Sequence, residues 1–280
     1  MKIRASAAGA DARAAGNTFI AVDDLENRLG SCEVSPMVIS ELMPNRPCEI
    51  RIAAEGDLSA RHQLLGTALT RAMMLARESG MNARIYAECA PEDSEELELF
   101  RSIGLTDDDA LVRMRRRAVA GPSVVRLPEG CALVHDRLED AQERAFFLER
   151  QSQLFRRENA AQWLDEITKK PLMRRLLLVS REGLCGEMLC WAEDQNTGVI
   201  GMVYTAPSWR RKGVASYLME SARQYFWQCR IPEITFDVRL RMTPVVRLAA
   251  AAGYRQSEVL LRYPGADLDA PAARRKIHTK

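Results

Sequence analysis

The 280-residue sequence has no large excess of charge of one sign and no apolar run long enough to cross a bilayer. Forty lysines and arginines are balanced by 38 aspartates and glutamates, so no overall field recruits nucleic acid or an acidic membrane. A spanning helix needs roughly 20 consecutive apolar residues, and charges and glycines interrupt the N-terminal segment where a signal peptide is continuously apolar. We therefore expect a cytoplasmic chain with no nucleic-acid and no membrane partner.

Histidine is also scarce, with three in the chain, and the seven cysteines are odd in number and scattered. None of the histidines lies at metal-ligand spacing from a cysteine pair, so we predict no metal site and expect reduced, buried thiols. The sequence also lacks G-x-S-x-G, G-x-x-x-x-G-K-[ST] and G-x-G-x-x-G. These absences remove the commonest signatures of hydrolases, NTPases and dinucleotide-binding enzymes.

What remains is an ordinary globular composition, 47% hydrophobic and 28% charged, with a length that favours two domains of roughly 150 residues. The clearest break is a charge run followed by small residues and a Gly-Pro turn, Arg115–Ser123. We predict a first domain at 1–118, a linker at 119–124, a second domain at 125–266 and a flexible tail at 267–280.

Hydrophobic periodicity predicts that both halves end in the order strand, helix, strand, helix, strand. In the first half we expect strands at Thr18–Asp24, Cys32–Glu41 and Cys48–Ala54, a helix at Gln63–Glu78, a strand at Ala83–Glu88, a helix opened by Pro91 and a strand at Leu111–Met114. In the second half we expect a strand at Cys131–His135, helices at Glu139–Phe155 and Glu158–Lys169, strands at Leu176–Ser180, Gly186–Ala192 and Gly198–Thr205, a helix at Gly213–Cys229, a strand at Glu233–Val238, a helix at Thr243–Ala252 and a strand at Glu258–Tyr263.

Glycine spacing suggests that the halves are a diverged repeat. Gly66 and Gly104 lie 38 residues apart, and Gly213 and Gly253 lie 40 apart. On this alignment, Gln63–Ala68 corresponds to Arg210–Ala215. The alternative interpretation is that two unrelated α/β segments share this spacing by chance.

The most informative stretch is Gly198–Ala215, in which an apolar strand, a Pro-Ser turn and three cations precede a glycine at the start of a helix. The first amides of a helix have no intrahelical partners and carry partial positive charge, and glycine lets an anion approach them closely. Without a bound anion, the positive end of the helix dipole would be repelled by the three cations that precede it, Arg210, Arg211 and Lys212. The pattern therefore favours a diphosphate ligand over a merely solvated turn.

This stretch resembles the GNAT superfamily of N-acetyltransferases. Arg210, Gly213 and Ala215 match the signature Arg/Gln-x-x-Gly-x-Gly/Ala, and the surrounding order of elements from Cys131 to Tyr263 is similar to that family. The resemblance implies two tandem α/β (α+β) domains, each a mixed, mostly antiparallel sheet flanked by helices. In the first half only Gln63, Gly66 and Ala68 match, which implies a degenerate copy.

The resemblance also implies acetyl-CoA as co-substrate. Backbone groups of Val203 and Thr205 would contact the pantetheine, and the diphosphate would be held by the residues around the helix start, Arg210, Arg211, Lys212, Gly213, Val214, Ala215 and Ser216. An amide near Val203 or Tyr204 would stabilise the oxyanion.

The proton donor is less clear, because the tyrosine usual in the family is replaced by Ala249 and the asparagine before that helix by Met242. Catalysis by positioning and oxyanion stabilisation is our preferred explanation. A substitute donor is the second, with Tyr204, Tyr254 and Cys229 as candidates. For the base we single out Glu187 and Asp237, the carboxylates nearest the expected cleft.

We expect N-acetylation of the amine of a small molecule or amino acid by direct attack. The alternative is a catalytically silent acyl-CoA-binding module, a sensor or scaffold. Phe146, Phe155 and Trp163 are candidates for an apolar acceptor pocket, with core packing as the competing interpretation. The sequence leaves the oligomeric state open, a homodimer included.

Overall fold

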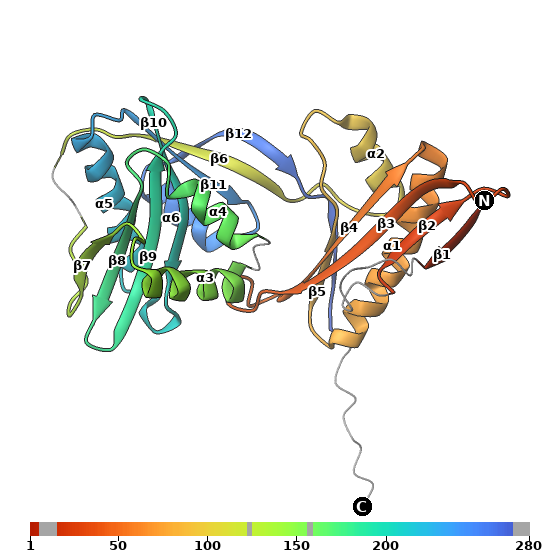
Figure 1. Ribbon diagram of the computed structural model, residues 1–280, viewed down its shortest axis with the longest axis horizontal. Helices are drawn as coiled ribbons and strands as arrows, with labels where there is room; N and C mark the ends of the chain where they lie inside the picture. The colour runs from red at the N-terminus through yellow and green to blue at the C-terminus, as the bar shows by residue number, and fades with distance from the viewer. Residues whose placement is uncertain (6–15, 122–124, 156–158, 271–280) are drawn as a thin grey trace, which may run out of the picture. The chain divides into compact units, whose positions relative to one another are not determined.

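The computed structural model describes the chain except for residues 6–15, 122–124, 156–158 and 271–280. It divides into two compact units: unit 1 comprises Met1–Ala110 and Leu261–Lys280, and unit 2 comprises Leu111–Leu260. Each unit is built on a mixed, mostly antiparallel sheet with helices packed against it, as Figure 1 shows. This confirms the predicted fold class. None of the described helices is long and apolar enough to span a membrane.

The sheet of unit 1 has the strand order β1-β2-β3-β4-β5-β13. Its one described parallel pair joins β4 to β5, and the other neighbours run antiparallel. Helices α1 and α2 pack on one face of this sheet. The elements are β1 (Lys2–Ala5), β2 (Thr18–Val22), β3 (Arg28–Val38), β4 (Cys48–Gly56), α1 (Leu58–Ser79), β5 (Ala83–Tyr86), α2 (Ser94–Ser102) and β13 (Gly265–Leu268).

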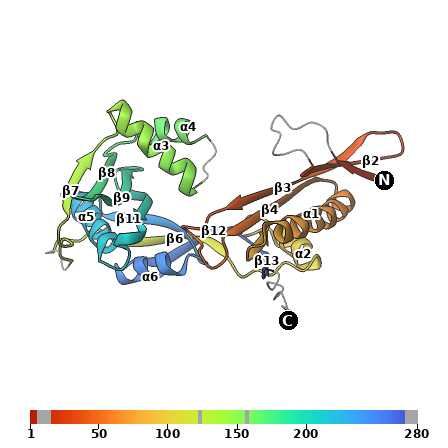
Figure 2. The same ribbon diagram turned by 90° about the horizontal axis from the view of Figure 1, so that it is seen from below.

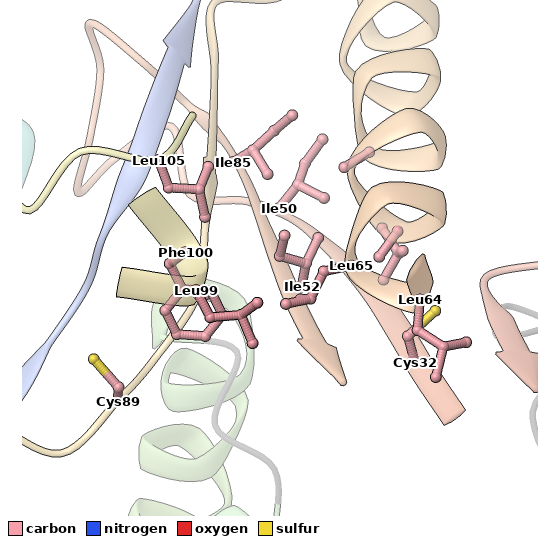
Figure 3. Close-up of a cluster of buried hydrophobic side chains, with 14 of the residues drawn as sticks. Cys32, Ile50, Ile52, Leu64, Leu65, Ile85, Cys89, Leu99, Phe100 and Leu105 are labelled. Carbon is pink, nitrogen blue, oxygen red and sulfur yellow. The ribbon is translucent and has the colours of Figure 1, made fainter. Parts of the chain in front are cut away.

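The core of unit 1 lies between α1 and the strands, as Figure 3 shows. Leu64 and Leu65 of α1 and Ile50 and Ile52 of β4 are at most 1% exposed, and each contributes about 2 kcal/mol by its burial. Alanines line the same side of the helix, and their small side chains let α1 approach the sheet closely. They are Ala60, Ala68, Ala72 and Ala76.

Helix α1 starts five residues before the predicted Gln63, at Leu58. The carboxylate of Asp57 accepts a hydrogen bond from the Ala60 amide at 2.8 Å and so caps the first turn. Gly66 therefore lies inside the helix, and the predicted match of Gln63–Ala68 to Arg210–Ala215 is wrong.

The position in unit 1 that is equivalent to Gly213 is Asp57, since each precedes the helix that follows the first strand of the parallel pair. Helix α1 has 22 residues and its counterpart α5 has 15, so the copy in unit 1 is two turns longer. The helix expected to open at Pro91 likewise starts later, at Ser94, because the Asp93 side chain caps it.

The sheet of unit 2 has the strand order β12-β6-β11-β10-β9-β8-β7. Figure 2 shows α3 and α4 on one face and α5 and α6 on the other. The elements are β6 (Ala110–Arg117), β7 (Ala132–Asp136), α3 (Ala141–Phe155), α4 (Ala160–Ile167), β8 (Arg174–Ser180), β9 (Gly183–Ala192), β10 (Thr197–Thr205), the 3-10 turn η1 (Pro207–Trp209), α5 (Val214–Gln228), β11 (Glu233–Arg239), α6 (Thr243–Ala251) and β12 (Arg255–Arg262).

The two units take strands from both ends of the sequence. Strand β6, which ends the first half of the chain, pairs antiparallel with β11 in the sheet of unit 2. Strand β13, near the C-terminus, pairs antiparallel with β5 in unit 1. The predicted divisions 1–118, 125–266 and 267–280 therefore differ from the structural units, because a strand joins whichever sheet edge is open to it, and local sequence does not specify that edge.

The charge run Arg115–Arg117 lies in β6 rather than in a linker. Arg113 is held by Asp237 through two hydrogen bonds of 2.9 and 3.0 Å, and Arg115 lies 3.1 Å from Glu233. The neighbouring strand therefore supplies counter-charges. In the predicted linker 119–124, residues 122–124 lie outside the described residues.

Candidate functional site

Strand β10 is paired with its two neighbouring strands over different lengths. It pairs in parallel with β11 only from Thr197 to Ile200, whereas its antiparallel pairing with β9 continues to Thr205. Beyond Ile200 the pairing of the two parallel strands ends, so the backbone groups of β10 on that side lie outside the β11 ladder, and among them the Thr205 carbonyl accepts Arg210 Nε. This V-shaped opening lies where the sequence places Val203 and Thr205.

A bulge at Gly201 accompanies the divergence, since the register with β9 shifts between Ile200 and Met202. A Cβ atom at Gly201 would overlap the ring of Trp191. Only glycine therefore lets the bulged backbone lie against this buried indole.

Two further glycines determine where α5 starts. A Cβ at Gly186 of β9 would lie 2.5 Å from Val214 Cγ1, and one at Gly198 of β10 would lie 2.6 Å from the Phe226 ring. Both ends of α5 thus pack directly on glycine backbone. This close packing brings the first turn of α5 to the end of β10.

The segment Arg210–Ser216, which we name the anion loop, joins η1 to the first turn of α5. Arg211 and Gly213 have φ angles of 63° and 83°, and alternation of this kind turns successive amides toward a common point. Gly213 is the N-cap and makes no side-chain capping bond. The first amides of α5 are therefore available to an anion.

The cations of the anion loop are arranged around its turn. Lys212 Nζ lies 4.9 Å from the centroid of the Trp209 ring, and Arg210 Nε donates to the Thr205 carbonyl at 3.3 Å. Arg210 is thereby tied to the last residue of β10. These residues give the loop positive charge beside the uncapped helix start, as a diphosphate requires.

The corresponding helix start in unit 1 has the opposite character. Asp57 places a carboxylate over the first turn of α1, where its oxygen accepts the Ala60 amide. His62 lies exposed on the second turn of that helix. The N-terminus of α1 is therefore occupied by the Asp57 carboxylate.

Glu187 of β9 is fully buried between two guanidinium groups. Its Oε1 accepts from Arg150 Nε at 2.6 Å, and its Oε2 accepts from Arg175 Nε at 2.9 Å and from Arg150 Nη2 at 3.0 Å. Arg175, 2% exposed, also donates to Asp136 and Glu143. Both oxygens of Glu187 therefore serve a buried ion network, which sequence analysis missed although an arginine inside the apolar strand Arg174–Ser180 signals a buried partner.

The other two predicted catalytic residues lie on the strands that border the opening. Tyr204 is opposite Glu187 in the β10–β9 register, so the two side chains share a sheet face. Asp237 follows Phe236, the last β11 residue paired with β10, and forms a bidentate ion pair with Arg113. The structure thus brings Tyr204 and Glu187 together and places Asp237 across the opening, bound to β6.

The substitute proton donors lie elsewhere in unit 2. The hydroxyl of Tyr254 is buried without a hydrogen-bond partner among the described residues, and burial raises its pKa above the ordinary value. Cys229 is the C-cap of α5. Ala249, at the usual tyrosine position, is fully buried in α6, and its carbonyl accepts the Tyr254 amide.

A cavity of about 420 Å³ lies between α3 and the strands β8 and β9. It contains the exposed ring of Phe146 and reaches Arg150 and Arg175, the partners of Glu187. Trp163 instead stacks on Phe147 at 6.4 Å within the core, and the side chain of Phe155 lies outside the described part of the chain. Among the described residues no group of His, Cys, Asp and Glu is arranged to hold a metal ion.

A mixed sheet whose parallel strands diverge ahead of a cationic loop and an uncapped helix is the arrangement that the resemblance to the GNAT superfamily implies. Residues 135–254 match the Acetyltransferase (GNAT) family, and this part of the chain is a GNAT-family acetyltransferase domain. Members of the family generally transfer acyl groups from acetyl-CoA. A search of curated proteins finds no match to the sequence.

Solved structures share the fold at low sequence identity. A GCN5-related N-acetyltransferase from Sphaerobacter thermophilus is 16% identical, with 91% of this chain and 83% of that chain covered and a TM-score of 0.51. A tandem GNAT protein from the clavulanic acid biosynthesis pathway is 14% identical over the same shares, with a TM-score of 0.46. The first likeness spans both units, so the shared fold extends beyond residues 135–254.

Proposed function

We propose that unit 2 transfers an acetyl group from acetyl-CoA to the amine of a small molecule or amino acid by direct attack. The divergence of β10 from β11 after Ile200, continuous with the anion loop, is the observation that carries this proposal. The opening would offer pantetheine the backbone groups of Val203 and the Thr205 amide, since the Thr205 carbonyl accepts Arg210 Nε. The loop that follows supplies amides and cations for the diphosphate, from Arg210 through Ser216.

Within this arrangement the thioester carbonyl would meet the Val203 amide, which the register with β9 turns toward the opening and which is the candidate for oxyanion stabilisation. The amine attacks the carbonyl carbon, the C–S bond breaks, and the coenzyme A thiolate leaves. Because this thiolate is a tolerable leaving group, positioning supplies much of the rate. We assign protonation of the thiolate to the hydroxyl group of Tyr204.

The acceptor would enter through the cavity beside Phe146. The cavity is lined by Arg150 and Arg175, which hold Glu187 opposite Tyr204, so it lies beside the strand pair that borders the opening. In this proposal Glu187 fixes the two arginines that line the cavity, and proton transfer from the amine passes through water to Asp237.

The second candidate function is a silent acyl-CoA-binding module. The buried Ala249 favours it, since the helix that carries a tyrosine hydroxyl in the family presents a methyl group here. The two functions share the ligand and differ only in turnover. A thiol-release assay with a panel of amines separates them: coenzyme A release supports the transferase, and binding without release on any amine supports the module.

The binding site itself is tested with Gly213→Glu, which places a carboxylate in the anion loop where a Cβ meets no atom within 4 Å. A like charge about 4 Å from a diphosphate costs roughly 4 kcal/mol at an effective dielectric constant of about 20, so acetyl-CoA should bind about 1,000-fold more weakly. Calorimetry measures the affinity.

Gly80→Glu is the matched control, because Gly80 also has a positive φ, 64°, and open space at its Cβ but ends α1 in unit 1. It introduces the same charge and a similar backbone strain of about 1–2 kcal/mol. Unchanged affinity in Gly80→Glu with loss in Gly213→Glu supports the site. Full affinity in Gly213→Glu overturns it.

A further inference from the structure

Two cysteines of unit 2 lie in contact although neither takes part in the proposed transfer. Cys131 directly precedes β7, Cys185 lies in β9, and their Sγ atoms are 3.5 Å apart. Cys131 is partly exposed, whereas Cys185 is buried. All seven cysteines are free thiols, and among the described residues this is the pair whose sulfur atoms are in hydrogen-bonding contact.

We propose that Cys131 and Cys185 are a redox-modification site and form a disulfide bond when the chain meets a small-molecule disulfide. A disulfide bond is about 2.05 Å long, so the sulfur atoms must approach by roughly 1.5 Å. Cys131 has room for this movement, since it follows a surface turn closed by its amide on the Pro128 carbonyl and precedes the edge strand of the sheet. Cys185 is held within the three-strand pairing of β8, β9 and β10.

Exposure determines the order of the chemical steps. The thiolate of Cys131 attacks one sulfur atom of the small disulfide, forms a mixed disulfide and releases one small thiol. The thiolate of Cys185 then attacks the Cys131 sulfur atom and releases the second. The two protein thiols are oxidised, the small disulfide is reduced, and the two protons leave with the released thiols.

The surroundings of the pair make this reaction slow. Burial and the neighbouring Cys185 thiol raise the pKa of Cys131 to about 11, while the Lys212 ammonium of the anion loop acts in the opposite direction. Little thiolate is present at neutral pH, so the pair equilibrates with thiol reagents over a long incubation rather than in a rapid burst.

The cross-link would form next to the anion loop. The carbonyl of Cys185 accepts the Ala206 amide at 3.0 Å, and Ala206 leads into η1 and the loop. Oxidation therefore ties the start of β7 to the residue that anchors this turn. The inference rests on the two sulfur atoms and does not depend on the proposed acetyl transfer.

The test is incubation of the full chain with oxidised glutathione at mildly alkaline pH, followed by alkylation under denaturing conditions, thiol counting and peptide mapping by mass spectrometry. We expect the seven titratable thiols to fall to five, with one cross-linked peptide pair that contains Cys131 and Cys185. Seven remaining thiols, or a cross-link between other cysteines, overturns the proposal.

Cys185→Ser and Cys131→Ser separate the two steps. In Cys185→Ser we expect glutathione to stay on Cys131 as an unresolved mixed disulfide, and in Cys131→Ser we expect all six thiols to remain. Circular dichroism establishes that each variant is folded. Glutathione retained on Cys131 of the unmodified chain, with no internal cross-link, also counts against the proposal.

Discussion

At the scale of single residues, Glu187 shows how an ion network supports a site. Glu187→Gln removes the negative charge from two guanidinium groups, one of which is 2% exposed. Because one partner of a buried pair is left uncompensated, we expect the free energy of unfolding to fall by about 3–5 kcal/mol. Urea denaturation measures it. The control is Glu149→Gln, which changes an exposed carboxylate that lines the same cavity. It should change the free energy of unfolding by less than about 0.5 kcal/mol. An equal loss of stability in both variants would contradict a stabilising role of the ion network.

Phe146 offers a second residue-scale prediction, this time for the acceptor. Its ring is 50% exposed in the cavity beside α3, so Phe146→Ala should disturb the fold little. If the acceptor lies there, steady-state kinetics should show a rise of about tenfold in the acceptor KM, since an apolar contact is worth about 1–3 kcal/mol. The KM for acetyl-CoA should not change. An unchanged acceptor KM would place the acceptor elsewhere.

At the scale of elements, the two helix starts that follow the parallel strands predict one ligand per chain. Gly213 leaves the α5 amides open, whereas Asp57 caps α1 with a carboxylate. Calorimetry should therefore give a stoichiometry of one acetyl-CoA. Asp57→Ala should lower stability by about 1 kcal/mol through loss of the cap and leave that stoichiometry unchanged. A stoichiometry of two in the unmodified chain would show that unit 1 also binds.

At the scale of the whole molecule, each sheet contains a strand from the other half of the sequence. Cleavage at a protease site inserted at 122–124 would leave β6 on a different fragment from the other strands of the unit 2 sheet. It would likewise leave β13 on a different fragment from the other strands of the unit 1 sheet. Because the exchanged strands keep their sheet hydrogen bonds, the cleaved fragments should co-elute in native size-exclusion chromatography and separate only in denaturant. Fragments that separate in native buffer would contradict this strand exchange.

Most helices and strands of unit 2, and the start of α5 at Gly213, were predictable, because they follow from local rules. Short apolar runs determine β9 and β10, and a glycine after three cations determines how α5 begins. The start of α1 was missed for an equally local reason, since the Asp57 cap was overlooked in favour of a glycine that lies inside the helix. Sequence also identified the missing tyrosine at Ala249.

What the sequence by itself determined is therefore the family resemblance and the start of α5 at Gly213, because a charge run and a capping glycine act within a few residues of one another. Only the tertiary structure decided which sheet receives β6 and β13, that Glu187 lies between Arg150 and Arg175, and that Cys131 touches Cys185. The reason is physical: an open sheet edge, a buried charge and a neighbouring thiol each find their partner through the packing of residues distant in sequence.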